Sequence, residues 1–283
     1  MADKQGDGLT RRDALKIGIG TTVGYALAAN PVLAQAIKTD TGGLKAGDIK
    51  IKSGGDTIPA YEAKPAHAGK HPVIVVVSEI FGVHEYIKDV CRRFAQKGYY
   101  AIAPELFVRE GGVAHLTSVP DIVKIVYNVP RKQILQDLSA AADHARKQPG
   151  ARADRVGATG FCWGGGTTIQ FASHYQELDA AVAWYGFPAV PYKDDPPKTG
   201  FDVAGDIVCP LLGLYGEADR LLPESDARKF EELLKAKGKN VEFVIYPGAQ
   251  HGFHADYRPS YKADAAKAGW AKCLIWFDRY LKA

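Results

Sequence analysis

The 283-residue sequence lacks several signatures, and each absence excludes a class of protein. No period repeats along the chain and no Gly/Ser/Pro-rich linker divides it after residue 45, which excludes a repeat protein and favours one large domain. No apolar run in the body of the chain is long enough to span a membrane. The net charge is only +4 and the basic residues form no cluster, which argues against nucleic-acid binding. With 46% hydrophobic and 24% charged residues, the chain has the composition of a folded protein.

Cysteine is scarce, with four residues in the chain. Their wide spacing contains no CxxC pair and no pattern typical of metal ligands, so we predict no metal site. A domain of this size has enough core not to need disulfides. Cys91, Cys209 and Cys273 lie among apolar neighbours in predicted helices or strands, where we expect them to be buried. Cys162 is different, because it stands in the glycine-rich stretch GATGFCWGGG.

Residues 1–36 have the composition of a targeting signal and not that of a folded domain. A polar start leads through Arg11 and Arg12 to an apolar run of small residues, and then to Ala34 and Ala36, either of which can precede a cleavage site. This pattern resembles a twin-arginine export signal, which implies transport by the twin-arginine translocation machinery and a periplasmic mature protein. The alternative is an amphipathic N-terminal helix or a membrane anchor.

The remaining chain, residues 37–283, alternates short apolar runs with segments of helical spacing. The predicted strands are 71–79, 99–105, 154–160, 180–186, 210–216 and 241–247. The predicted helices are 84–98, 131–147, 163–170, 224–238 and 261–281. Buried strands that alternate with helices predict a single α/β domain with a mostly parallel central sheet and helices on both faces. In such a sheet, functional groups gather where strands end and helices begin.

At one of these strand ends, GFCWG fits the G-x-nucleophile-x-G pattern of a nucleophile elbow. Gly160 and Gly164 have no side chains, which allows a strained turn and a close approach between the helix and the strand. Such a turn would hold the Cys162 sulfur at a helix N-terminus, where the dipole and the free N–H groups favour a thiolate. The alternative is a packed cysteine in a glycine-rich bend, because short matches of this kind also arise by chance.

Two later strand ends supply candidate partners for this nucleophile. Asp219 lies in the loop just beyond one strand, with Asp226 as a nearby alternative inside the following helix pattern. His251 follows the next strand beside two glycines, and His254 is close enough in sequence to compete with it. The order of Cys162, acid and histidine, each after its own strand, is that of the α/β-hydrolase fold. The sequence therefore predicts a Cys-His-Asp triad.

The motifs SEIFGVH, GFCWGG and HGF, together with the Asp219 loop, make the chain resemble the dienelactone hydrolase (carboxymethylenebutenolidase) family from about residue 50 to the C-terminus. Members of that family use cysteine where most α/β hydrolases use serine. The resemblance implies hydrolysis of a cyclic enol-lactone, or of a related carboxylic ester, through a thiol nucleophile. It implies no metal and no organic cofactor.

The resemblance also suggests roles for three further residues. Glu79 ends the most apolar predicted strand, which is an unusual place for a carboxylate unless it has a partner or belongs to a site. By resemblance, Glu79 lies near the resting thiol and helps to deprotonate it, whereas the alternative is a buried salt bridge to an arginine on the next helix. The backbone N–H of Trp163 and, by resemblance, that of Ile80 would form the oxyanion hole.

The small-molecule substrate is less well defined by the sequence. Family members that take dienelactone bind its carboxylate with arginines, one of them four residues after the histidine, and here that position is Ala255. Arg258 or Arg109 would have to substitute, although either could be a surface residue. Trp163 and Tyr185 are candidates to line an aromatic pocket, with core packing as the alternative for both.

Two hypotheses of different classes follow from the sequence. The first is a cysteine hydrolase that cleaves a lactone or carboxylic ester through a thioester acyl-enzyme. The second is a non-catalytic or redox-sensing protein of the same fold, in which Cys162 reacts with oxidants or only packs.

Overall fold

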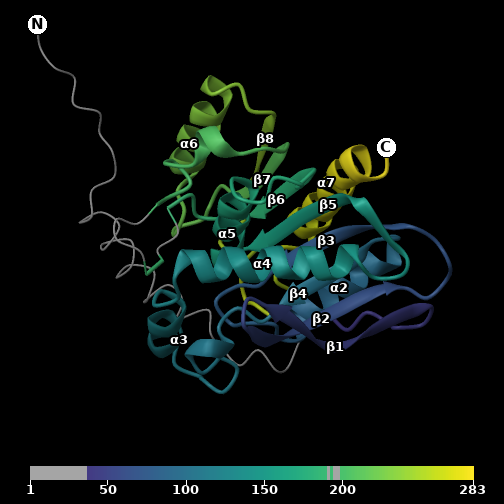
Figure 1. Cartoon of the computed structure of the whole chain (residues 1–283). Helices are drawn as coiled ribbons and strands as arrows, with labels where there is room; N and C mark the ends of the chain where they lie inside the picture. The colour runs from purple at the N-terminus through teal and green to yellow at the C-terminus, as the bar shows by residue number, and fades with distance from the viewer. Residues whose placement is uncertain (1–36, 190–191, 194–197) are drawn as a thin grey trace, which may run out of the picture.

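The computed structural model describes residues 37–189, 192–193 and 198–283, so the predicted export segment lies outside the described residues. The described strands form an eight-stranded sheet in the order β1-β2-β4-β3-β5-β6-β7-β8. Figure 1 shows helices on both faces of this sheet. The predicted α/β architecture with a mostly parallel sheet is therefore confirmed.

The parallel part of the sheet brings several strand ends together at one edge. The strands are β1 (Leu44–Ser53), β2 (Asp56–Pro65), β3 (His71–Val77), β4 (Tyr100–Pro104), β5 (Ala151–Phe161), β6 (Ala180–Trp184), β7 (Leu211–Gly216) and β8 (Val241–Tyr246). Strands β3 to β8 pair in parallel, whereas β2 runs antiparallel to both β1 and β4. Because β3, β5, β6, β7 and β8 point the same way, the residues that follow them share one edge of the sheet.

The helices cover the sheet in two layers. They are α2 (Glu85–Gln96), α3 (Val119–Val126), α4 (Arg131–Arg146), α5 (Trp163–Ala172), α6 (Glu224–Ala236) and α7 (Ala263–Leu281), with the short 3₁₀ helices η1 (Val108–Glu110) and η2 (Ala204–Asp206). Helices α2 and α7 meet through Phe94, whose ring centroid lies 4.6 Å from Trp270 and 5.8 Å from Phe277. On the other side, α4 contacts α5. No helix within the described ranges has both the length and the apolar character needed to cross a membrane.

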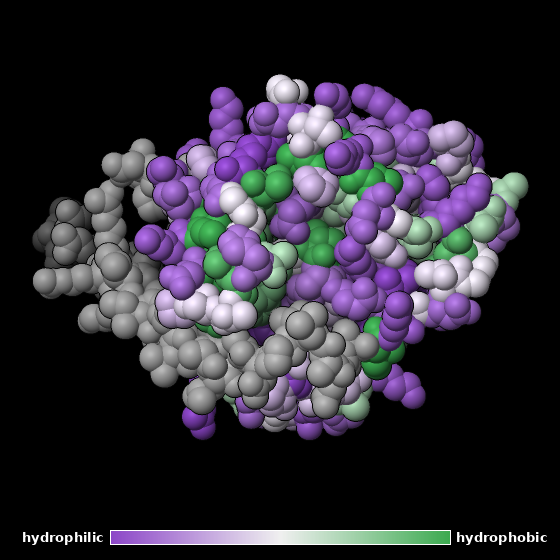
Figure 2. Space-filling view, turned by 90° about the horizontal axis from the view of Figure 1, so that it is seen from below, coloured by the Kyte–Doolittle hydropathy of each residue, from purple (hydrophilic) through white to green (hydrophobic). Residues whose placement is uncertain are grey.

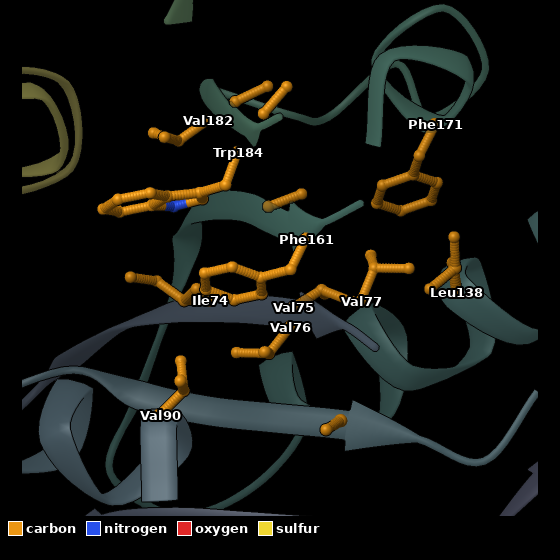
Figure 3. Packing of buried hydrophobic residues seen from close by; sticks show 14 of the residues in the cluster. Ile74, Val75, Val76, Val77, Val90, Leu138, Phe161, Phe171, Val182 and Trp184 are labelled. Carbon is orange, nitrogen blue, oxygen red and sulfur yellow. The ribbon is translucent and has the colours of Figure 1, made fainter. Parts of the chain in front are cut away.

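The core lies along the central strands. Every residue of β3 is buried, as expected for a parallel strand that is covered on both faces, and this explains its unbroken apolar run. Figure 3 shows Phe161 and Trp184 from the neighbouring strands β5 and β6 lying one above the other, and their ring centroids are 5.5 Å apart. Val77, Leu138 and Phe171 gather in another part of the same view. The ends of β3, β5 and β6 are thus held by close packing on both faces.

The surface of the described part carries few large apolar side chains. Those classed as exposed are Ile37, Val208, Tyr261 and Ile275. On the face seen in Figure 2, hydrophobic residues form small patches separated by polar ones. This is the ordinary surface pattern of a folded domain.

Three elements were not expected from the sequence. The strands β1 and β2 form an antiparallel hairpin across the two-residue loop of Gly54 and Gly55, and α3 lies in a segment that carried no predicted helix. The hairpin has a partly exposed, alternating pattern, so it lacks the continuous apolar run that identified the other strands. The Gly-Gly pair between alternating runs was the signal that could have found it.

Glycines allow α5 to lie very close to the strand ends. A Cβ at Gly160 would lie 2.2 Å from the carbonyl oxygen of Gly164, and a Cβ at Gly164 would lie 2.3 Å from the carbonyl oxygen of Ser78. On the other side, a Cβ at Gly165 would lie 2.7 Å from the Cα of Gly186, just after β6. Since all of these neighbours are backbone atoms, none can rotate away. The GFCWGG motif therefore sets the position of α5 against β3 and β6.

We expect Gly164→Ala to lower the free energy of unfolding by about 3 kcal/mol or more, because the added methyl group displaces α5 from the end of β3. Gly47→Ala is the matched control, since a Cβ at Gly47 meets nothing within 4 Å. The control should change stability by no more than about 0.5 kcal/mol. Urea denaturation followed by circular dichroism measures both variants, and equal effects would contradict the assigned packing.

Candidate active site

Cys162 lies at the sharp turn between β5 and α5. Its φ of 57° and ψ of −120° place a non-glycine residue in a strained region, and it is the N-cap residue of α5. The residue is completely buried. The sulfur is therefore held at the positive end of a helix by a backbone conformation that only a tightly packed turn can maintain.

The structure brings Asp219 and His251 together with this cysteine. Nδ1 of His251 lies 2.8 Å from Oδ2 of Asp219, and the imidazole is also hydrogen-bonded to the side chain of Cys162. The other carboxylate oxygen, Oδ1 of Asp219, accepts hydrogen bonds from the backbone N–H groups of Leu221 and Leu222 at 2.8 and 3.0 Å. The acid is thus fixed by its own loop, and the histidine bridges the acid and the thiol.

The electrostatics of this trio favour a charged imidazole. Burial lowers the pKa of His251, but the negative charges of Asp219 and Cys162 and the hydrogen bonds to both raise it more strongly, to about 10. At neutral pH the imidazole can therefore hold a proton beside Asp219 and Cys162.

The competing residues named from the sequence lie elsewhere. Asp226 is in the first turn of α6, where its carboxylate is 3.7 Å from Nζ of Lys229. His254 is buried, with Nδ1 2.5 Å from the hydroxyl of Tyr86. Burial lowers the pKa of His254 to about 3, so it stays neutral. Asp219 and His251, and not Asp226 and His254, are thus the residues in contact with each other and with Cys162 as the predicted triad requires.

Glu79 forms a second charged cluster at the same edge of the sheet. Its side chain is completely buried, and Oε1 lies 2.9 Å from Nη2 of Arg258. Tyr257 donates a hydrogen bond to Oε2, and Nε2 of His84 lies 3.8 Å from the same oxygen. Burial raises the pKa of Glu79, but Arg258, His84 and Tyr257 lower it, and the balance brings it to about 2. Glu79 is therefore an anion held by partners.

This cluster changes the interpretation of two arginines. Arg258 is a buried partner of Glu79 and not a surface residue, and it comes from the segment after His251 and not from the next helix as the salt-bridge alternative supposed. Arg109 is not brought to this cluster. Its guanidinium binds Asp137 and Asp56 at 2.6 and 2.7 Å, between α4 and the β1–β2 turn. The structure thus gives Arg109 a structural role in place of the substrate contact considered from the sequence.

Tyr185 and Trp163 are both buried beside the triad. Tyr185 has a positive φ of 38°, and its ring centroid is 5.1 Å from that of His251 in an edge-to-face contact. The ring of Trp163 lies 5.2 Å from that of Phe107. Both aromatic residues are buried, and so is Cys162. Their burial therefore does not decide between core packing and a place beside the site.

The two residues predicted as oxyanion donors, Trp163 and Ile80, come from neighbouring segments of the fold. Trp163 is the first residue of α5, and the N–H groups of a first helical turn have no carbonyl partner within the helix. The close contact between Gly164 and the carbonyl of Ser78 places the segment that contains Ile80 near this helix end. The arrangement suits stabilisation of a negative oxygen.

The other cysteines are buried and free, and all four cysteines lie in the described part of the chain. Burial raises the pKa of Cys209 to about 12 and also raises the pKa of Cys91 and Cys273. Within the described residues, no group of three or more His, Cys, Asp or Glu side chains is arranged to hold a metal ion. Cys162 is thus the cysteine with a polar, reactive neighbourhood.

Sequence reasoning did not identify two partners of Glu79. His84 and Tyr257 both contact its carboxylate, from the start of α2 and from the loop after His251. His84 lies inside the SEIFGVH motif, so its proximity in sequence was a usable signal. Nothing in the sequence pattern marked Tyr257.

The sheet order, the strained turn at Cys162 and the three strand ends define an α/β-hydrolase fold. The chain belongs to the dienelactone hydrolase family, whose sequence profile matches residues 58–281. Membership of this family, together with the relatives described next, supports the assignment of the protein as a carboxylic ester hydrolase.

Named relatives cover almost the whole chain. A protein from Methylorubrum extorquens described as "Putative carboxymethylenebutenolidase" is 48% identical over 96% of this chain and 94% of its own length. A protein of the same description from Salmonella typhimurium is 45% identical over 91% of this chain and 96% of its own. The crystal structure of a putative dienelactone hydrolase from Klebsiella pneumoniae aligns with a TM-score of 0.80 at 45% identity, covering 84% of this chain and 99% of that one.

We expect Asp219→Asn to lower the pKa of His251 by about 1–3 units, because the opposite charge and its hydrogen bond are lost. Since the folded-state pKa of about 10 lies above the unfolded value, the proton on His251 stabilises the fold fully below about pH 6.5 and less as the pH rises toward 10. The stability difference between wild type and variant should therefore shrink over that range. An NMR titration of the imidazole measures the shift, and an unchanged titration would contradict the assignment.

Proposed function

We propose that the protein hydrolyses a lactone or carboxylic ester with Cys162 as nucleophile, and the observation that carries this proposal is the Cys162–His251–Asp219 constellation at a strained strand-to-helix turn. The thiolate sulfur attacks the carbonyl carbon and forms an S–C bond. The bond from that carbon to the leaving oxygen then breaks, and the proton on His251 goes to the leaving oxygen. Asp219 holds the ring in the required orientation throughout.

The tetrahedral intermediate of each step carries a negative oxygen. The backbone N–H groups of Trp163 and Ile80 are the proposed donors to that oxygen. Removal of one such donor typically costs about 2.7–4 kcal/mol of barrier, so their placement matters as much as that of the side chains. The glycines that fix α5 against β3 would set this placement.

Deacylation completes the cycle. His251, neutral after giving up its proton, takes a proton from water, and the water oxygen attacks the thioester carbonyl. The C–S bond breaks, the acid product leaves, and the thiolate is again paired with the imidazolium. The sequence suggested that Glu79 deprotonates a resting thiol. Glu79 is a buried anion paired with Arg258, and its role in deprotonating the thiol stays a prediction.

The descriptions of the relatives indicate the type of reaction that we propose for this protein. Two of them carry the description "Putative carboxymethylenebutenolidase", a term for an enzyme that cleaves an unsaturated lactone. We carry over the reaction, hydrolysis at a lactone or ester carbonyl, to this chain. The competing hypothesis of a non-catalytic or redox-sensing protein has no comparable support, because a cysteine that only senses oxidants does not need an acid held against its histidine.

We expect wild type to hydrolyse p-nitrophenyl acetate and Cys162→Ala to lose at least about 1,000-fold in kcat/KM, since the nucleophile is gone. Cys209→Ala is the matched control, because Cys209 is also buried but lies away from the triad. Mass spectrometry of the quenched wild type should show an acetyl group on Cys162. Equal rates for wild type and Cys162→Ala across short esters and enol-lactones would sink the hydrolase proposal.

We further propose periplasmic delivery by the twin-arginine route, on the basis of Arg11 and Arg12 before an apolar run of small residues. Replacement of both arginines by lysine should leave the full-length chain in the cytoplasm. Fractionation followed by immunoblotting measures this. Continued export and processing of the double-lysine variant would refute the proposal.

A further inference from the structure

The loop between β3 and α2, residues 78–84, is held near both of its ends. At its start, the carbonyl oxygen of Ser78 lies against α5, since a Cβ at Gly164 would lie 2.3 Å from it. Near its end, the backbone N–H of Val83 donates a hydrogen bond of 2.9 Å to Oε2 of Glu105. Ile80, the second predicted oxyanion donor, lies between these two contacts in the chain. The position of its N–H therefore depends on the contact at Glu105 as well as on the contact at α5.

Glu105 is itself held by the sheet. It directly follows β4, and its backbone N–H donates a hydrogen bond of 2.9 Å to the carbonyl oxygen of Pro59 in β2. Its carboxylate fills the inside of the turn at Gly82, because a Cβ at Gly82 would lie 2.8 Å from Oε2 and 2.9 Å from Oε1. Gly82 has a φ of 72°, a conformation that glycine adopts without strain. The loop thus turns around a carboxylate whose backbone is fixed.

The carboxylate of Glu105 interacts with two backbone N–H groups. Burial raises the pKa of Glu105, whereas the N–H groups of Val83 and Phe107 and the charge of Lys88 lower it. A hydrogen bond to a charged acceptor is stronger than one to a neutral acceptor. Val83 belongs to the loop after β3 and Phe107 to the segment after β4, and these two strands are neighbours in the sheet. The carboxylate therefore joins two adjacent strand ends at the edge that carries the triad.

We propose that Glu105 is a positioning residue for the hydrolysis. By holding Val83, its carboxylate keeps the backbone N–H of Ile80 in place to stabilise the negative oxygen of the tetrahedral intermediate. In this role Glu105 does not touch the substrate and acts through the loop. The inference rests on the proposed Cys162 hydrolase and its proposed oxyanion donors, and it adds a residue that sets their geometry.

Two reagents that react with Cys162 in different ways separate this role from a general one. Trifluoroacetophenone forms an S–C bond with the thiolate, and the electron pair of its C=O bond moves to the oxygen, which becomes negative. Iodoacetamide forms an S–C bond while iodide leaves, so no negative oxygen develops. Displacement of an oxyanion donor therefore weakens binding of the ketone and leaves alkylation by iodoacetamide unchanged.

We expect Glu105→Ala to lower kcat for p-nitrophenyl acetate about 10- to 100-fold with KM within about 3-fold of wild type, because the lost interaction is made only in the transition states. The inhibition constant of trifluoroacetophenone should rise by a similar factor. The rate of alkylation by iodoacetamide should stay within about 3-fold of wild type. Glu105→Gln keeps an oxygen acceptor for Val83, so it should recover kcat to within about 5-fold of wild type.

Asp179→Ala is the matched control. Asp179 directly precedes β6, at the opposite edge of the sheet from Cys162, and its Oδ2 accepts a hydrogen bond of 2.8 Å from the backbone N–H of Val156. Burial raises the pKa of Asp179 as it does that of Glu105. The control therefore removes the same kind of contact far from the triad. Its kcat, inhibition constant and alkylation rate should all stay within about 3-fold of wild type.

An unchanged inhibition constant in Glu105→Ala, or a fall in its alkylation rate as large as that in kcat, would overturn the role given to Glu105. If Glu105→Ala does not fold, Gly82→Ala tests the same contact, because the added Cβ pushes against the carboxylate. The same loss in kcat with a constant alkylation rate is expected, and its absence would overturn the inference. If wild type hydrolyses p-nitrophenyl acetate no faster than Cys162→Ala, the proposed function fails and this inference fails with it.

Discussion

The close approach of α5 to the ends of β3 and β6 is the constraint on which the rest of the site depends. Backbone atoms fill the space where the Cβ atoms of Gly160, Gly164 and Gly165 would stand. Because the helix begins at this contact, the chain between strand and helix must turn within one residue, and Cys162 takes the strained conformation. That turn aims the sulfur at the edge where His251 arrives. A looser contact would relax the turn and move the Cys162 sulfur together with the helix N–H groups.

Two charged groups lie at this edge of the sheet, and their carboxylates are held by different partners. Asp219 accepts hydrogen bonds from two backbone N–H groups of its own loop. Its other oxygen lies beside Nδ1 of His251, and the imidazole is also hydrogen-bonded to Cys162. Glu79 is enclosed with Arg258 and is neutralised there. The first group joins an acid, an imidazole and a thiol, whereas the second is a buried ion pair of Glu79 with Arg258.

The sequence predicted the elements with strong local signals and missed those without them. A continuous apolar run predicted β3, which is covered on both faces, and the alternation of strand-like and helical segments predicted β4 to β8. The exposed hairpin β1–β2 has only a weak alternation and was missed. Glycine spacing predicted the turn at Cys162, because a backbone contact leaves a trace in residue type. The partners of Glu79 leave no such trace in the sequence. Tyr257 lies 178 residues from Glu79 along the chain, and only the fold brings Tyr257 and Arg258 to it.

Arg258 illustrates why spacing in sequence is a poor guide to a substrate pocket. Counting residues from His251 places an arginine four positions on, and this chain has Ala255 there and its arginine three positions later. In space, that shift is enough to direct the guanidinium to Glu79, where burial of both groups demands that they pair. Arg258 is therefore held as a buried partner of Glu79. The partner of a buried cation thus depends on which charges the fold brings to it, and spacing along the chain does not contain that information.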